Sequence, residues 1–236
     1  MTPNVPTIRE MPMRPSSSHP RRRVALLVAA VALSLATGCS YLLGVRTTPP
    51  RLYVLSSTPA DATLALPPDT VLGFGPVDIP AYLDRRGIVR RVDANRLEES
   101  RTDLWAEALG SGFKAVVEQN LRLRLPGVPI RTFPWPLVHQ PTFAVAIEVS
   151  RFELTPGGTV ELSARYGVRT PDDGVTRVER DTTLVEAVRG PGSEDVVAAM
   201  SAAVGKLSNE VARSIGEAAS SARSGATATS GRKRSR

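Results

Sequence analysis

The sequence predicts an α+β domain in which an antiparallel sheet of about five to seven strands packs against two main amphipathic helices. Two stretches, 103–124 and 193–218, repeat apolar residues at spacings of three and four, as helices packed on a sheet do. Residues 142–188 instead form three alternating runs separated by turn signals, which indicates strands. Cys39 is the only cysteine, so packing and not an intramolecular disulfide must stabilise this α/β domain.

The first half of the domain holds four short strand candidates followed by a helix. The strand candidates are residues 51–57, 71–79, 88–92 and 96–99. The second of them is expected near an edge of the sheet, because Pro76 cannot donate to a ladder of hydrogen bonds. The helix is expected to begin near Asp103, with Thr102 or Ser100 as its N-cap, and to stop at Pro126. Its apolar face consists of Trp105, Leu109, Phe113, Val116, Val117 and Leu121.

The second half is expected to contain a brief strand at 128–133 and then three long strands joined by tight turns. Residues 142–154 alternate most clearly, and their phase shifts near Ser150, which indicates a bulge or a twist. Turn residues follow at 156–158 and 171–174. The three strands are therefore expected to form an antiparallel meander.

A second amphipathic helix closes the expected domain. Ser193 is a suitable N-cap, and the acidic residues directly after it suit the positive end of a helix. The apolar repeat ends near Ala218. Beyond it Ser, Ala, Gly, Thr and Arg dominate without a period, which predicts a disordered basic tail over 220–236. The expected domain therefore spans residues 51–219.

The chain begins with the features of a bacterial secretory signal peptide. Three arginines at 21–23 precede thirteen mostly apolar residues at 24–36, and Cys39 follows closely. This apolar run is too short to cross a bilayer as a helix, which needs about 20 residues. Three methionines are alternative translation starts: Met1, Met11 and Met13.

The position of Cys39 indicates a lipid anchor. Residues 35–39 resemble a lipobox, in which the cysteine sulfur accepts a diacylglyceryl group. Cleavage between Gly38 and Cys39 then frees an amine for a third acyl chain such as palmitate. Residues 1–38 would be the signal peptide, and residues 39–50 a tether whose last two residues are stiff prolines. The alternative is an ordinary secreted protein that is cleaved near Ala36 and has a free thiol at Cys39. Apart from the covalent lipid, no cofactor is expected.

The basic charge of the whole chain does not belong to the expected domain. The formal net charge is +7 at pH 7, which suggests a nucleic-acid partner at first sight. Between Cys39 and Ser221, however, 20 basic residues stand against 22 acidic ones, because the excess arginines lie in the leader and the tail. A nucleic-acid site needs a basic patch on the folded part, so no nucleic-acid partner is expected.

The expected mature chain lacks the patterns of catalytic and metal sites. It contains one histidine, His139, and no G-x-S-x-G motif, so a Ser-His-Asp hydrolase is not indicated. A zinc site needs several His or Cys ligands, which this chain cannot supply once Cys39 is acylated. Residues 73–75 lack the Gly-Lys-Ser/Thr sequence of a phosphate loop. The sequence therefore predicts neither an enzyme nor a metal protein.

Two strings in the first half of the domain carry a family resemblance. The first runs from Gly75 to Arg85 (GPVDIPAYLDR) and continues at 88–91 (IVRR). The second, at 105–109 (WAEAL), opens the first helix. Together they resemble the ABC-type transport auxiliary lipoproteins, the PqiC/YmbA-like family, over most of residues 52–218. The family pattern usually has proline in place of Ala108.

The resemblance implies an antiparallel sheet with two helices, and it implies a function. Such lipoproteins accompany a permease, an ATPase and an MCE-domain protein that spans the periplasm, and the set moves lipids or other hydrophobic molecules across the envelope. The lipoprotein would dock the end of the MCE assembly, and a ring of identical subunits is one arrangement for this. In similar lipoproteins a serine at the place of Ser40 favours the outer membrane, so its periplasmic face is the expected location.

Two loops contain candidate partner contacts. Tyr82, Leu83 and Arg85 form a turn after an edge-type strand, where a partner has access, although the same residues equally suit a role in the fold. Trp135 has proline on both sides, so it is either an exposed contact or a cover for one end of the core.

Two other functions stay open at this point. One is a purely structural lipoprotein that has no transport partner. The other is a lipid carrier that binds acyl chains in a groove between sheet and helices. The residues expected to line such a groove are Phe143, Ile147 and Trp105.

Overall fold

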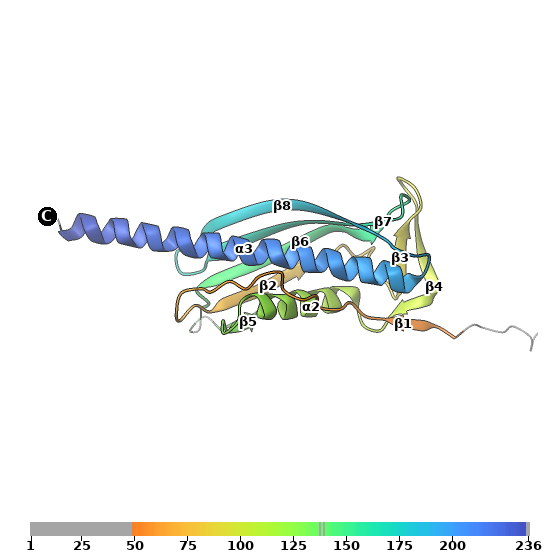
Figure 1. Cartoon of the computed structure of the whole chain (residues 1–236), viewed down its shortest axis with the longest axis horizontal. Helices are drawn as coiled ribbons and strands as arrows, with labels where there is room; N and C mark the ends of the chain where they lie inside the picture. Colours follow the sequence, from red (N-terminus) through yellow and green to blue (C-terminus); the bar gives the residue numbers. More distant parts are fainter. Residues whose placement is uncertain (1–48, 137, 139, 235–236) are drawn as a thin grey trace, which may run out of the picture. The chain divides into compact units, whose positions relative to one another are not determined.

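Two helices pack on one eight-stranded sheet, which confirms the predicted α+β class (Figure 1). The computed structural model describes residues 49–136, 138 and 140–234, so Cys39 and the predicted signal peptide lie outside it. The helices are α2 (Leu109–Arg124) and α3 (Ser193–Arg234). The strands are β1 (Arg51–Tyr53), β2 (Leu72–Asp78), β3 (Gly87–Arg91), β4 (Leu97–Trp105), β5 (Ile130–Thr132), β6 (Phe143–Leu154), β7 (Thr159–Thr170) and β8 (Val175–Ala187).

The sheet is mixed, which corrects the expectation of an antiparallel sheet of five to seven strands. Its order is β1-β4-β3-β6-β2-β5, and β7 and β8 continue from the other edge of β6. The antiparallel meander of β6, β7 and β8 is confirmed. The pairs β1/β4, β2/β5, β2/β6 and β3/β6 are parallel. Turn signals predict hairpins between sequence neighbours, whereas parallel strands need a crossover, so sequence reasoning missed these pairs.

The strand β6 is the central element of the sheet. Its whole length pairs with β7, and the register shifts between Val149 and Arg151, where the phase shift near Ser150 predicts a bulge. On its other edge β6 pairs with β2 along its first half and with β3 at Leu154. The strand β2 is thus interior and not at an edge. Pro76 is tolerated there because β5 pairs only with the first three residues of β2.

The first helix begins later than predicted, and Trp105 is not part of it. Trp105 ends β4 and is buried beside β1, while α2 starts at Leu109. The predicted cap residue Ser100 forms its capping contacts inside the strand, because its Oγ accepts from the N–H of Asp103 at 2.9 Å. The same hydroxyl donates to Asp103 Oδ2 at 3.1 Å. The helix ends at Arg124, close to the predicted stop.

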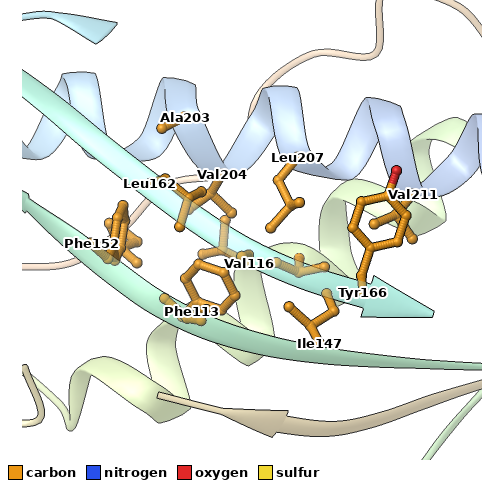
Figure 2. Packing of buried hydrophobic residues seen from close by; sticks show 14 of the residues in the cluster. Phe113, Val116, Ile147, Phe152, Leu162, Tyr166, Ala203, Val204, Leu207 and Val211 are labelled. Atoms are coloured by element: carbon orange, nitrogen blue, oxygen red, sulfur yellow. The ribbon is translucent and has the colours of Figure 1, made fainter. Parts of the chain in front are cut away.

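The core lies between the helices and the sheet (Figure 2). Phe113 of α2 packs edge-to-face on Phe152 of β6, with ring centroids 5.5 Å apart. The buried face of α3 covers β7 and β8 with the residues that repeat at helical spacing. The helix continues to Arg234, into the segment 220–236 that the sequence predicts to be disordered.

Candidate interaction surface

The predicted contact residues of the turn between β2 and β3 do not share one environment. Leu83 is 1% exposed and belongs to the hydrophobic core, so its side chain is not available to a partner. Tyr82 is half-buried, and Arg85 is exposed. The turn is accessible as predicted, but only part of it presents side chains to solvent.

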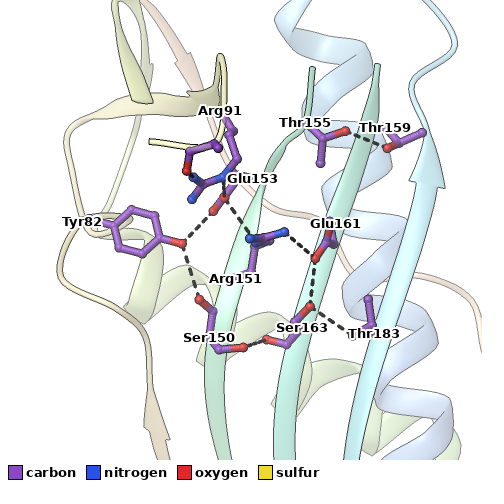
Figure 3. Close-up of polar contacts among 11 residues, drawn as sticks. Tyr82, Arg91, Ser150, Arg151, Glu153, Thr155, Thr159, Glu161, Ser163 and Thr183 are labelled. Atoms are coloured by element: carbon purple, nitrogen blue, oxygen red, sulfur yellow. Dashed lines mark hydrogen bonds and ion pairs between the residues drawn. The ribbon is translucent and has the colours of Figure 1, made fainter. Parts of the chain in front are cut away.

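Tyr82 fixes this turn to the sheet through Glu153 (Figure 3). The Tyr82 hydroxyl donates to Glu153 Oε2 at 2.9 Å and lies 3.4 Å from the carbonyl oxygen of Ser150. Glu153 is 0% exposed, which is unusual for a carboxylate unless it is paired. The turn therefore closes over a buried acid near the end of β6.

Two arginines supply the charge that Glu153 needs. Arg91 Nε of β3 donates to Glu153 Oε1 at 2.7 Å, and Arg151 Nε lies 3.6 Å from the same oxygen. Arg151 also pairs with Glu161 of β7 at 2.9 Å. Ser163 bonds both Glu161 and Thr183 of β8, so the contacts run across four strands (Figure 3). We call the following set of residues the Glu153 network: Tyr82, Arg91, Arg151, Glu153, Glu161, Ser163 and Thr183.

The electrostatics of the Glu153 network favour a neutral tyrosine and charged arginines. Burial, and then the bond to Glu153, raise the pKa of Tyr82 to about 12. The hydrogen bond with Glu153 raises the pKa of Arg91 above its usual range. The Tyr82 hydroxyl therefore stays neutral and Arg91 stays charged at physiological pH.

The Glu153 network lies at one end of a polar sheet face that the helices do not cover. Along β6 the buried Ile147 and Val149 point to the core, so Glu148 and Ser150 point away from it. Arg165 of β7 pairs with Asp181 of β8 at 2.9 Å on this side, where a shallow depression has a volume of about 260 Å³. We call this side of β6, β7 and β8 the open face.

The open face is polar, which is compatible with a transient protein interface. Interfaces of this kind are about as polar as the rest of a protein surface and contain many hydrogen bonds. It carries exposed charges of both signs, such as the pair of Arg165 and Asp181. In the described part of the chain, no three His, Cys, Asp or Glu side chains are grouped to hold a metal ion.

Trp135 lies against the sheet near β2 and β5. Its ring packs edge-to-face on Phe133 with centroids 5.3 Å apart, and its Nε1–H donates to Gln140 Oε1 at 3.2 Å. A Cβ at Gly73 would lie 2.9 Å from two ring atoms, so glycine is needed beneath the ring. Trp135 is half-buried, so part of its ring covers the sheet at Gly73 and the rest is accessible to solvent.

The residues predicted to line a lipid groove do not line one. Phe143, Ile147 and Trp105 are buried side chains of the hydrophobic core. Figure 2 shows Ile147 among core side chains of the sheet and of both helices. Among the described helices, none is both long and apolar enough to cross a membrane.

The comparison with known families decides the family. Residues 53–212 match the ABC-type transport auxiliary lipoprotein component family. The chain belongs to this family. The resemblance seen in residues 75–91 and 105–109 is thereby confirmed. The family is described as an auxiliary component of transport and not as a family of enzymes.

Solved structures agree with the fold of this auxiliary lipoprotein. A protein described as uncharacterized superposes with a TM-score of 0.60 at 20% identity, covering 71% of this chain and 99% of its own. A DUF330 protein from Xanthomonas campestris superposes with a TM-score of 0.58 at 15% identity, covering 74% and 99%. At these identities the likeness shows the fold alone. The chain has no significant match among curated protein sequences.

Proposed function

We propose that this auxiliary lipoprotein is anchored in the outer membrane and docks the periplasmic end of an MCE-domain protein. The partner would belong to an ABC-type system with a permease and an ATPase that moves lipids or other hydrophobic molecules. Family membership supports the association with transport. The lipobox-like string that ends at Cys39 supports the anchor, and Ser40 supports the outer membrane by resemblance.

The expected anchor fits a docking role. A single acyl chain binds membranes only marginally, whereas two or more hold stably, so three chains on Cys39 would suffice. The tether of residues 39–50 reaches at most about 40 Å when extended, which keeps the domain close to the membrane surface. A partner that spans the periplasm would therefore meet the domain at the membrane.

One observation favours a docking role over a lipid carrier that binds acyl chains within the core. It is the contrast between the two sides of the sheet. The covered side is filled by core side chains, whereas the open face presents polar and charged groups to solvent. In the described residues β8 also has a free edge 13 residues long, whose charged side chains discourage nonspecific pairing. A ring of identical subunits would use such an edge without covering the open face.

The docking proposal is tested by chemical cross-linking in cell envelopes. We expect the wild-type chain to capture the MCE-domain protein, and Arg165→Glu to reduce the capture by about tenfold, or about 1.4 kcal/mol. The matched control is Arg122→Glu, which also breaks an exposed ion pair but lies on α2. Equal capture by both variants would remove the open face from the proposal, and repeated absence of the MCE protein would refute docking.

The anchor is tested separately. We expect Cys39→Ala to leave the precursor uncleaved or to release the protein from the membrane fraction, as measured by sedimentation and by the mass of the N-terminal peptide. A variant that matures and sediments with the outer membrane as the wild type does would show that Cys39 is not the anchor. Sucrose-gradient separation of the two membranes tests the predicted location.

A further inference from the structure

A groove of about 870 Å³ lies between α3, β8 and the segment 61–67, and it shares no lining residue with the depression on the open face. Its volume is in the range of small-molecule binding sites. It is lined by the segment 61–67, by Arg124 of α2, by Leu184 of β8 and by α3 between Lys206 and Arg223. Its apolar lining includes Leu64, Leu66, Leu184, Ala212 and Ala219.

Close contacts hold one wall of this groove in place. A Cβ at Gly205 would lie 2.2 Å from Thr58 Oγ1, and one at Gly216 would lie 2.6 Å from Leu64 Cδ2. These two glycines therefore let the segment approach the helix directly. The N–H of Leu64 donates to the carbonyl oxygen of Arg124 at 2.8 Å. The wall is thus built against both helices before any ligand arrives.

Arg124 fixes the start of the same wall. Its buried guanidinium donates to Thr58 Oγ1 and to the carbonyl oxygen of Pro59, both at 3.2 Å. Its Nε also donates to the side-chain oxygen of Asn209, whose own amide group donates to Asp61. The segment is therefore attached to α2 and α3 at several points, and this preorganisation lowers the cost of binding.

The charged side chains of α3 that line the groove differ in their partners. Lys206 pairs with Glu186, and Glu217 pairs with Arg180 at 2.8 Å. Glu210 has no ion pair among the described residues, although its charge helps to raise the pKa of Arg180 on β8. Arg213 donates through Nε to a carbonyl oxygen of its own helix at 3.4 Å and has no ion pair among the described residues.

We propose that this groove binds a single-chain amphiphile with an anionic headgroup. The alkyl chain would lie on the apolar lining, and the headgroup would bind the guanidinium of Arg213. Charge-assisted hydrogen bonds of this kind are stronger than neutral ones and favour carboxylate or phosphate oxygens. A fatty acid and an acidic lysophospholipid share this chemistry, and either would give the auxiliary lipoprotein direct contact with a hydrophobic cargo.

The test uses the full-length protein in isolated envelopes and a fatty acid with a photoreactive diazirine and a terminal alkyne. We expect light-dependent labelling on peptides that contain Leu64, Leu184 and Gly216, read by mass spectrometry. Ser220→Trp should lower the labelling about tenfold, or about 1.4 kcal/mol, because Ser220 lines the groove. Ser224→Trp is the matched control, since both serines are exposed and bond back to the helix in the same way.

The headgroup is tested by competition. Unlabelled oleate and lysophosphatidylglycerol should both displace the probe, and the one that acts at lower concentration identifies the source of the anion. Arg213→Gln should weaken displacement by oleate about tenfold and leave displacement by oleyl alcohol unchanged. The proposal would be overturned if the two tryptophan variants were labelled equally or if the label were spread over the whole chain. Displacement of the probe by a neutral lysolipid at a lower concentration than by oleate would also overturn it. None of these measurements requires the MCE protein, so their failure is distinct from a failure of docking.

Discussion

Two buried charges, one on each side of the sheet, fix two loops in different ways. Arg124, which is 1% exposed, fixes the segment after β1 on the helix side, and Glu153, which is 0% exposed, fixes the turn after β2 near the open face. Both charges therefore hold a loop in position on the domain.

The two charges differ in what compensates them. Glu153 meets guanidinium groups directly, whereas Arg124 donates to neutral oxygens of Asn209, Thr58 and Pro59. Burial consequently lowers the pKa of Arg124, and the charge of Asp61 opposes this only from a distance. A cation satisfied by neutral acceptors depends on all of them being in place, so the helix side should be the more sensitive of the two.

Arg124→Met should have the largest effect on stability. Methionine keeps the apolar stem but leaves the buried oxygens of Thr58, Pro59 and Asn209 without their donor, which should cost about 3 kcal/mol in the free energy of unfolding. Urea denaturation measures the change. Arg122→Met on the same helix removes only an exposed ion pair and should cost about 0.5 kcal/mol. Equal costs for the two variants would contradict the role of Arg124.

Glu153→Gln should have the next largest effect. The amide keeps the shape of the side chain but removes the charge that Arg91 and Arg151 face, which should lower the free energy of unfolding by about 2 kcal/mol. Glu98→Gln is the control, because its pair with Arg90 is exposed and should contribute less than about 0.5 kcal/mol. If Glu153→Gln cost more than Arg124→Met, the order proposed for the two sides would be reversed.

Tyr82→Phe should have the smallest effect, and the effect should depend on pH. Loss of the bond to Glu153 should cost about 1 kcal/mol near pH 8. The folded pKa of Tyr82, about 12, is above the ordinary value near 10. The neutral hydroxyl therefore stabilises the fold fully below about pH 10, and this is lost as the pH rises through about 12. Denaturation midpoints at several pH values should show the two proteins converging over this range, and a constant difference would refute the assignment.

Sequence reasoning succeeded where neighbouring residues determine the structure. The meander of β6, β7 and β8 follows from alternation and turn residues, and the bulge near Ser150 was visible as a change of phase. It failed where distant segments meet. The parallel pairs of β2 with β5 and β6 leave no local signal, and the cap-like contact of Ser100 with Asp103 formed inside a strand instead of at a helix.

The candidate surface was predicted only in part for the same reason. Tyr82 was identified because it lies in an accessible turn, but Leu83 beside it serves the core. Glu153 could not be singled out, since the sequence places it on a polar strand face and does not show that Tyr82, 71 residues earlier, covers it. Its position between Phe152 and Leu154 in the shifted phase was the only local signal.

The anchorage of the segment after β1 by Arg124 has a mechanical consequence. The chain leaves the predicted tether at Pro50, forms the three residues of β1, and reaches Thr58 and Pro59 within nine residues. A pull on the N-terminal side would first load the short β1/β4 ladder and then the bonds of Arg124. Because these bonds connect to both helices, they would transmit such a force to α2 and α3. The force would then not reach β2 and the centre of the sheet.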